Sequence, residues 1–386
     1  TDVFENFRKT CIKNYCLDPA NYVSAPSLAW DAMLYKTGIK LEQVSDYKIF
    51  NMIEDQKRGG LCFLGSLRHA KANNRYLSDY DNTKPETYLM YWDMNNLYGF
   101  AMVDFLPTGG HKIVEVFNLE DILNTPDDSP VGYLLRVDLE FPEDIHELLK
   151  EYPPAPENIA PKAEWLSDYQ RELAEKTEIN INTKQQKLIP HLHNHNRYVV
   201  DYRNLKYLVS LGVKVSNVHD VVSHNQSRWL KPYIDFNTEM RKNAKNEFEK
   251  DFFKLVNNSV FGKTMENVRN RMNMHLTTCD KNAKKWFSKP TFKNCVETFG
   301  IYMIEMHKEE VTLDKPIYVG TSVLDLSKLC MMDFHYNTIN INFEGKYNLP
   351  YSDTDSLVYS IQHDDIYEWI KIISNILIYQ TALDLI

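Results

Sequence analysis

Two aspartates lie one residue apart in this sequence, Asp353 and Asp355 in the stretch Tyr351–Ser356. Carboxylates this close repel each other, so grouping them is unfavourable unless a cation lies between them. Oxygen-only ligands suit magnesium or manganese. The spacing therefore indicates a divalent-cation site, to be weighed against a calcium loop, a phosphatase-type nucleophile and a solvated turn.

Two of these alternatives conflict with the neighbouring residues. A calcium loop that opens with Asp-x-Asp needs Asp or Asn at its fifth position and glycine at its sixth, where this chain has Leu357 and Val358. A phosphatase nucleophile would follow a fully apolar strand, and the segment 348–352 is not apolar. For the hexapeptide alone, a catalytic site and a solvated turn both remain open.

Flanking segments predict how the pair is presented. Leu357–Ile361 favours a strand, and Ile339–Phe343 alternates apolar and polar residues with the period of a strand. We therefore expect the aspartates at the tip of a hairpin. The segment Val323–Phe334 predicts a helix that packs behind this hairpin.

A third acid, Asp93, follows the apolar and aromatic run Thr87–Trp92. Such a run predicts a buried strand. A carboxylate at the end of a buried strand is presented at the edge of a site, and the alternative is a plain strand-end cap.

The strongest helix prediction covers residues 238–262, with Thr238 and Glu239 at its start and Gly262 as its stop. At about 100° per residue, Phe248, Phe252 and Leu255 share one stripe. The opposite stripe holds Lys250, Lys254, Asn258 and Phe261. A solvated lysine face explains the two lysines but not the asparagine and the phenylalanine beside them.

Two further groups of residues could bind ligands. Lys57–Gly60 combines two cations with two glycines, which suits close approach to a phosphate, although an ordinary turn fits as well. His191, His193 and His195 alternate along an extended segment. A zinc site is open to them, but no cysteine or acid completes a ligand set, so we expect surface histidines.

Composition limits the functional classes. The 386 residues are 43% hydrophobic and 25% charged, which indicates a globular protein of two or three domains. The net charge of −9 argues against a general cationic grip on nucleic acid but permits a local basic channel. The six cysteines contain no Cys-x-x-Cys pair and indicate reduced thiols in an intracellular protein. No signal peptide or membrane span is expected.

Taken in order, the strand-ending acid, the Lys/Asn/aromatic helix and the Asp-x-Asp hairpin resemble motifs A, B and C of family B DNA polymerases. The corresponding segments are Asp93–Gly99, Lys254–Gly262 and Tyr351–Ser356. The likeness is greatest to the protein-primed branch, in particular the polymerases of Maverick/Polinton transposons. The phrases that carry it are 28–33, 231–238 and 262–271, and it covers the chain to about residue 361.

The resemblance implies template-directed DNA synthesis from deoxynucleoside triphosphates with two magnesium or manganese ions. It implies that Asp93, Asp355 and the Met94 carbonyl hold the ions and that Asp353 is an auxiliary carboxylate. Lys254 and Lys250 would hold the triphosphate. Further implied contacts are Tyr98 under the sugar, Asn258 and Phe261 on the new base pair, and Arg58, Gly59, Gly60, Tyr351 and Ser356 on DNA.

Four positions depart from the common family pattern. Asn96 stands in place of serine, Gly99 in place of proline, Phe261 in place of tyrosine, and Lys57 in place of the tyrosine of Tyr-x-Gly-Gly. The expected partners are a DNA template and primer, deoxynucleoside triphosphates and a terminal protein as a candidate primer. The expected location is intracellular, and nuclear in a eukaryotic host.

The implied fold is α+β: a polymerase palm with an antiparallel sheet, helical fingers and a remnant of the exonuclease domain, with the thumb essentially missing. The implied divisions are the exonuclease remnant at 1–56, a linker and first palm segment at 57–104, palm with an insertion at 105–235, fingers at 236–265, a second insertion at 266–315, and palm with a truncated tail at 316–386. Two rival functions remain: a decayed or domesticated transposon fragment that binds DNA without catalysis, and a metal-dependent nuclease or phosphatase.

Overall fold

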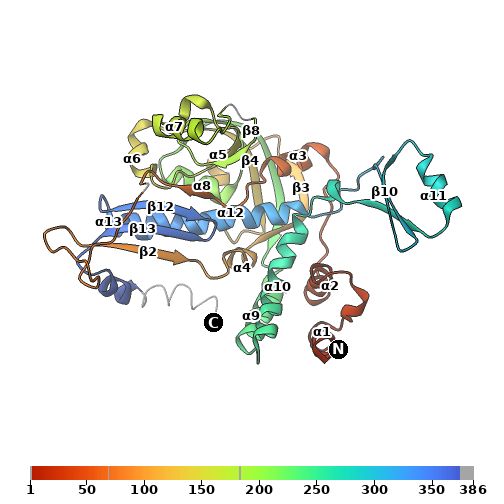
Figure 1. The fold of residues 1–386 in the computed structure, drawn as a ribbon. Coiled ribbons are helices and arrows are strands. Elements are labelled where there is room, and N and C mark those ends of the chain that lie inside the picture. Colours follow the sequence, from red (N-terminus) through yellow and green to blue (C-terminus); the bar gives the residue numbers. More distant parts are fainter. Residues whose placement is uncertain (1, 68, 182–183, 374–386) are drawn as a thin grey trace.

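A computed structural model describes residues 2–67, 69–181 and 184–373 as helices around antiparallel sheets (Figure 1). The central sheet has the strand order β1–β12–β13–β2, formed by Cys62–Leu64, Tyr347–Asp353, Ser356–Gln362 and Thr87–Asp93. One face of this sheet packs on the long helix α12 (Ile317–Asp333), with Leu357 and Tyr359 in the same buried cluster as Met331 and Met332. The expected α+β fold is thus confirmed.

The predicted hairpin is present, but its first strand is not the predicted one. β12 and β13 are joined at Asp353–Ser356. Ile339–Phe343, expected to be a strand, is helical: α12 continues into a π-helix (Phe334–Asn340) and α13 (Ile341–Phe343). Ile339 and Phe343 are buried, whereas Ile341 is 68% exposed. The segment therefore uses a spacing of four residues, which the alternation of two had concealed.

β2 is a strand, as expected, but it is not a buried one. It lies at the edge of the central sheet, and its residues alternate between the two faces. Tyr88 is buried on the α12 side, whereas Tyr91 is 62% exposed on the other side. The aromatic run that suggested full burial instead supplies one packed face and one open face, and Asp93 belongs to the open one.

Four helices form a block beside the sheet: α1 (Asp2–Tyr15), α2 (Ala25–Thr37), α9 (Lys231–Lys242) and α10 (Glu247–Thr264). The single helix predicted over 238–262 is wrong, because α9 ends at Lys242 and Asn246 caps a new helix through a bond from Glu249 N–H. Gly262 lies inside α10. Phe252 is buried as expected, but Phe248 and Leu255 are exposed and Phe253, Val256 and Val260 take their place in the core.

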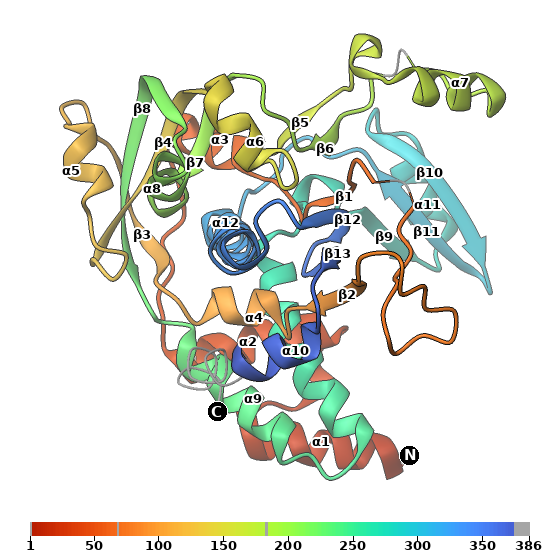
Figure 2. The same ribbon diagram turned by 90° about the vertical axis from the view of Figure 1, so that its left-hand side faces the viewer.

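A second four-stranded sheet has the order β3–β8–β4–β7, formed by Leu106–Ile113, Lys214–Ser227, Val131–Glu140 and His195–Asp201. Its neighbouring helices are α3 (Tyr47–Asp55), α5 (Leu119–Leu123), α6 (His146–Leu149) and α8 (Tyr202–Ser210). A two-stranded ribbon of β5 (Glu157–Ile159) and β6 (Lys187–Ile189) lies between the sheets with α7 (Asp168–Lys176) beyond it (Figure 2).

A small lobe projects from the rest of the molecule (Figure 1). It contains β9 (Asn273–Thr277), α11 (Asp280–Phe287), β10 (Phe292–Thr298) and β11 (Ile301–Met306). Its own core holds Ala283, Ile304 and Met306. All six cysteines are free, and no helix in the described part of the chain is both long and apolar enough to span a membrane.

Candidate active site

The turn between β12 and β13 carries the two spaced aspartates. Thr354, between them, has a φ of 57°, an uncommon conformation for a β-branched residue. The turn is held by hydrogen bonds from Thr354 N–H to the Leu61 carbonyl (2.8 Å) and from Asp355 N–H to the Asp353 carbonyl (2.7 Å). These hydrogen bonds fix the backbone as a tight turn, so the two carboxylates lie at the tip of the hairpin and not within a continuous strand.

The loop before β1 supports this turn from the other side. A Cβ at Gly60 would lie 2.3 Å from Thr354 Oγ1 and 2.8 Å from Thr354 Cβ. Only glycine allows the loop to approach Thr354 this closely. Gly60, singled out as a DNA contact, thus has a packing role against the turn, while its neighbour Gly59 is exposed.

Arg58 does not lie on a DNA-binding surface, contrary to expectation. It is buried, with Nη1 donating to the Val199 carbonyl (2.7 Å) and the guanidinium 3.7 Å from the Tyr198 ring centroid. Its own carbonyl accepts a 2.6 Å bond from the Lys328 ammonium. The cation thus anchors the loop inside the protein and is not available to a phosphate.

Lys328 belongs to a buried polar network that also contains Asp325. Gln56 Nε2 donates to Asp325 Oδ2 (2.8 Å), and Asp201 N–H donates to the same oxygen (3.3 Å). Burial lowers the pKa of Lys328 to about 8, while burial raises the pKa of Asp325 against the attraction of Lys328 and Arg58. Sequence reasoning missed this network, although two charges three residues apart in the apolar run of α12 were a signal for it.

Asp93 and Met94 meet the turn at the end of β2. Asp93 and Asp353 are both register partners of Ser356, on neighbouring strands. Met94 N–H donates to the Asp355 carbonyl (2.8 Å). Asp93, Met94 and Asp355 line one pocket of about 500 Å³, whose other walls are mostly apolar. The three groups expected to share metal ions therefore lie together, although they are 262 positions apart along the chain at their extremes.

The electrostatics of these carboxylates are unbalanced. Burial, then the Asp93 and Asp353 carboxylates, raise the pKa of Asp355, and the Lys254 ammonium opposes them. In the described residues no ion pair joins a cation to any of the three aspartates. Asp93 and Asp353 accept hydrogen bonds from tyrosine hydroxyls, Tyr91 to Asp93 (3.3 Å) and Tyr351 to Asp353 (3.1 Å). Two carboxylates and a carbonyl without an internal counter-ion fit magnesium or manganese.

The four residues of the predicted Lys/Asn/aromatic stripe lie on the outer side of α10. Lys250, Lys254 and Asn258 are exposed and Phe261 is half-buried. Lys254 lies close enough to influence Asp355 and makes no hydrogen bond or ion pair within the described residues. Lys250 instead pairs with Glu247, with 3.3 Å between Nζ and Oε1, so its charge is already partly engaged.

Tyr98 joins the motif A helix to the motif B helix. It lies in α4 (Leu97–Met102), and its ring stacks on Phe261 with centroids 4.5 Å apart and planes at 27°. Burial and the Asp355 carboxylate raise the pKa of Tyr98. An aromatic floor thus extends from Phe261 towards the aspartates.

The remaining predicted DNA contacts divide in two. Tyr351 is part-exposed on the open face of the sheet beside Asp353. Ser356 is buried, and its hydroxyl donates to the Asp353 carbonyl (3.2 Å). Ser356 thus closes the turn and is not a free DNA contact, because its hydroxyl is already used where the chain reverses.

Comparison with known proteins agrees with this geometry. The family model for DNA polymerase type B, organellar and viral, matches residues 75–341, more than half of the chain. The chain belongs to this family. The matched range includes Asp93 and Lys254 and ends before Asp353 and Asp355, which the fold brings to the same place. No curated protein matches the chain.

Solved structures show the same fold. The chain is similar to Phi29 DNA polymerase complexed with primer-template DNA and incoming nucleotide substrates, with a TM-score of 0.50 and 17% identity over 92% of this chain and 50% of that one. It is also similar to Phi29 DNA polymerase in the post-translocation binary complex with primer-template DNA, with a TM-score of 0.51 and 15% identity over the same shares. The chain thus spans about half the length of these polymerases.

Proposed function

We propose that this chain is the catalytic core of a protein-primed DNA polymerase of the Maverick/Polinton type, which extends a primer on a DNA template. The observation that carries the proposal is that Asp93 and Asp355, from distant parts of the chain, line one pocket. Lys254, from a third part, lies near enough to lower the pKa of Asp355. Membership of the type B polymerase family supports it. The terminal-protein primer is proposed on the branch resemblance alone.

In the proposed reaction, the primer 3′-oxygen forms a bond to the α-phosphorus of the incoming triphosphate, and the bond from that phosphorus to the bridging oxygen of pyrophosphate breaks. Two divalent ions held by Asp93, Asp355 and the Met94 carbonyl would stabilise the attacking and leaving oxygens. Asp353 would adjust the charge at the site through its position beside Tyr351.

The chain's own cation and rings would hold the nucleotide. Lys254, which has no internal partner in the described residues, would neutralise the triphosphate as pyrophosphate leaves. Lys250 would assist after exchanging Glu247 for phosphate. The Tyr98–Phe261 stack would form the floor under the sugar and the new base pair, with Asn258 beside it. Gly59 and Tyr351 would face the DNA.

Primer extension tests the proposal. The full chain is given a labelled primer on a DNA template, the four deoxynucleoside triphosphates and magnesium, and both product length and released pyrophosphate are measured. We expect extension by the native chain and at least a thousandfold (~10³) loss in Asp355→Asn, because a metal ligand is removed. The control is Asp364→Asn, an exposed carboxylate beyond the far end of β13.

Three other results of this experiment would favour a different function. Equal extension by Asp355→Asn contradicts the assignment. DNA binding without extension by the native chain supports the fragment that binds without catalysis. Release of nucleoside monophosphate or free phosphate in place of pyrophosphate supports the nuclease or phosphatase.

A further inference from the structure

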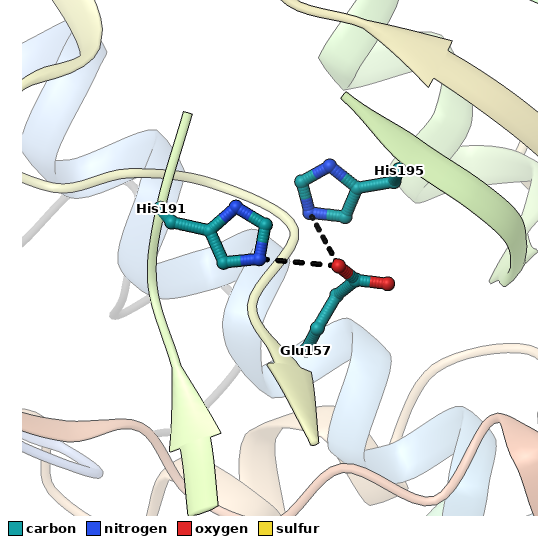
Figure 3. Close-up of side chains that lie close together, drawn as sticks. All are labelled: Glu157, His191 and His195. Carbon is teal, nitrogen blue, oxygen red and sulfur yellow. Dashed lines mark hydrogen bonds and ion pairs between the residues drawn. The ribbon is translucent and has the colours of Figure 1, made fainter. Parts of the chain in front are cut away.

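The expectation of surface histidines holds for His193, which is exposed, and is wrong for His191 and His195. These two belong to a side-chain cluster far from the palm aspartates. His195 is fully buried at the start of β7, and His191 lies in the connection from β6. Their rings stack with centroids 4.6 Å apart. Glu157, from β5, supplies the acid that the linear sequence did not reveal, and its carboxylate points between the two rings (Figure 3).

The three side chains have the distances of a ligand set. Glu157 Oε2 lies 3.1 Å from His191 Nε2 and 3.8 Å from His195 Nε2. All three ligand atoms lie within 4.8 Å of one another, and this is the one such group of His, Cys, Asp or Glu in the described residues. A tetrahedral zinc ion with bonds of about 2.0–2.1 Å places its ligand atoms about 3.3 Å apart. Small side-chain movements would therefore close the set.

We propose that Glu157, His191 and His195 bind one transition-metal cation of the zinc class. Two imidazoles and a carboxylate are a ligand set that zinc takes readily. The Ala155 carbonyl oxygen, 2.7 Å from His195 Nε2, is placed to serve as the fourth ligand. Exposed fractions of 9% for the His191 side chain, 0% for His195 and 23% for Glu157 give a site shielded from solvent.

Without a cation, the same groups form a hydrogen-bonded cluster. His193 N–H donates to His191 Nδ1 (3.3 Å), which leaves the ring proton on His191 Nε2 to donate to Glu157. His195 Nε2 donates to the Ala155 carbonyl, and its Nδ1 is buried with no partner. Cation binding displaces both Nε2 protons and costs the long bond from His193, so the two states exclude each other and can be told apart.

The position of the cluster gives the cation a structural role. It joins the β5–β6 ribbon to the second sheet, where His195 pairs with Leu139 of β4. The residue after Glu157 is Asn158, whose Nδ2 donates to the Lys57 carbonyl (2.8 Å). The metal would therefore stiffen the anchor of the loop that leads to Gly60 and the aspartate turn.

Zinc itself is the probe. The background chain carries Asp93→Asn with Asp355→Asn, so that zinc at the palm carboxylates does not contribute. Binding is measured by competition with a chromogenic chelator, together with the melting temperature with and without zinc. Cobalt in place of zinc gives a visible spectrum that reports a tetrahedral nitrogen and oxygen site.

We expect one equivalent bound by the background chain and at least ~100-fold weaker binding after Glu157→Gln or His191→Asn, because each removes a direct ligand and even outer partners are worth 10–100-fold. His193→Asn is the matched control, since His193 stacks on Trp165 outside the cluster. Zinc should raise the melting temperature of the background and His193→Asn chains only.

Three results would overturn the proposal and leave the hydrogen-bonded cluster. They are the absence of a bound equivalent, binding by Glu157→Gln and His191→Asn as tight as by the background chain, and a loss in His193→Asn as large as in those two variants. Circular dichroism confirms that each variant is folded.

Discussion

Asp355 and Asp325 are both withdrawn from water, and their surroundings are opposite. Asp325 is fully buried among the donors Gln56 and Asp201 N–H and the cations Lys328 and Arg58. Asp355 is partly buried and has two more carboxylates as neighbours, against the single cation Lys254. The difference separates two kinds of carboxylate: Asp325 has its donors and cations within the fold, whereas Asp355 has one cation against two like charges, which suits its proposed role as a metal ligand.

The largest effect on stability is expected at the satisfied site. Asp325→Asn removes the negative charge that balances Lys328, so we expect the free energy of unfolding to fall by about 3 kcal/mol. Urea denaturation of the full chain measures it. The double variant Asp325→Asn with Lys328→Met should recover part of the loss, because Arg58 is then the one buried cation left without the carboxylate, in place of two. A loss below about 0.5 kcal/mol in the single variant would show that the charge of Asp325 does not stabilise the fold.

The loop between the two sites gives the next effect. Gly60→Ala places a methyl group against Thr354, so the turn that carries Asp353 and Asp355 must move. We expect primer extension to fall by about 100-fold, the cost of a displacement of order 1 Å at a catalytic group. The rescue variant is Gly60→Ala with Thr354→Gly, which removes the contact and suits the φ of 57°. Full activity in Gly60→Ala alone would separate the loop from the turn.

A buried group without a counter-charge should respond to acid. Burial lowers the pKa of His335 to about 3, and Nδ1 lies 2.9 Å from the Tyr359 hydroxyl. In the unfolded chain this histidine has its ordinary pKa of about 6.5, so it takes up a proton at a higher pH than in the folded chain. The contribution of His335 to the free energy of unfolding is therefore complete above about pH 6.5 and is lost as the pH decreases towards 3. For His335 the loss at pH 5 is about 2 kcal/mol.

This contribution is measured by urea denaturation at pH values from about 7 to about 5. The native chain is compared with His335→Gln and His307→Gln. His335→Gln should show the shallower slope, by about 1.4 kcal/mol per pH unit. His307 is exposed and serves as the control. An unchanged slope in His335→Gln would mean that His335 accepts its proton without unfolding.

The smallest effect on stability is expected at Asp355. The change Asp355→Asn, which should abolish extension, should leave the free energy of unfolding unchanged or raise it by up to about 1 kcal/mol, because it relieves repulsion from Asp93 and Asp353. Urea denaturation in metal-free buffer, beside Asp325→Asn, measures it. Destabilisation of similar size in both variants would contradict the distinction between the two carboxylates.

The residues proposed to face a ligand were easier to single out from the sequence than the residues that support them. Asp93, Lys254 and Asp355 were singled out because repelling charges and a Lys/Asn/aromatic stripe are unusual unless something binds there, and their roles stay a prediction. Arg58 was assigned to DNA because a cation beside two glycines has the same letters whether it faces phosphate or a buried carbonyl. Burial is decided by Val199 and Tyr198, more than 130 positions away, and no local pattern contains them.

Local periodicity failed in a related way. In Ile339–Phe343 the apolar residues Ile339, Ile341 and Phe343 fit the spacing of a strand, and Ile339 and Phe343 alone fit the spacing of a helix. The segment is helical because it continues the preceding helix α12. Glu157 was missed because its histidine partners lie 34 and 38 positions further on, across a ribbon that sequence spacing does not indicate.

The projecting lobe has one more consequence. Its first and last strand residues, Asn273 and Met306, are register partners, so the polypeptide enters and leaves the lobe at neighbouring positions. A cut and splice there would leave the palm and α10 continuous. The lobe could therefore be shortened or exchanged as one unit without moving the strands and the helix that carry the aspartates and Lys254.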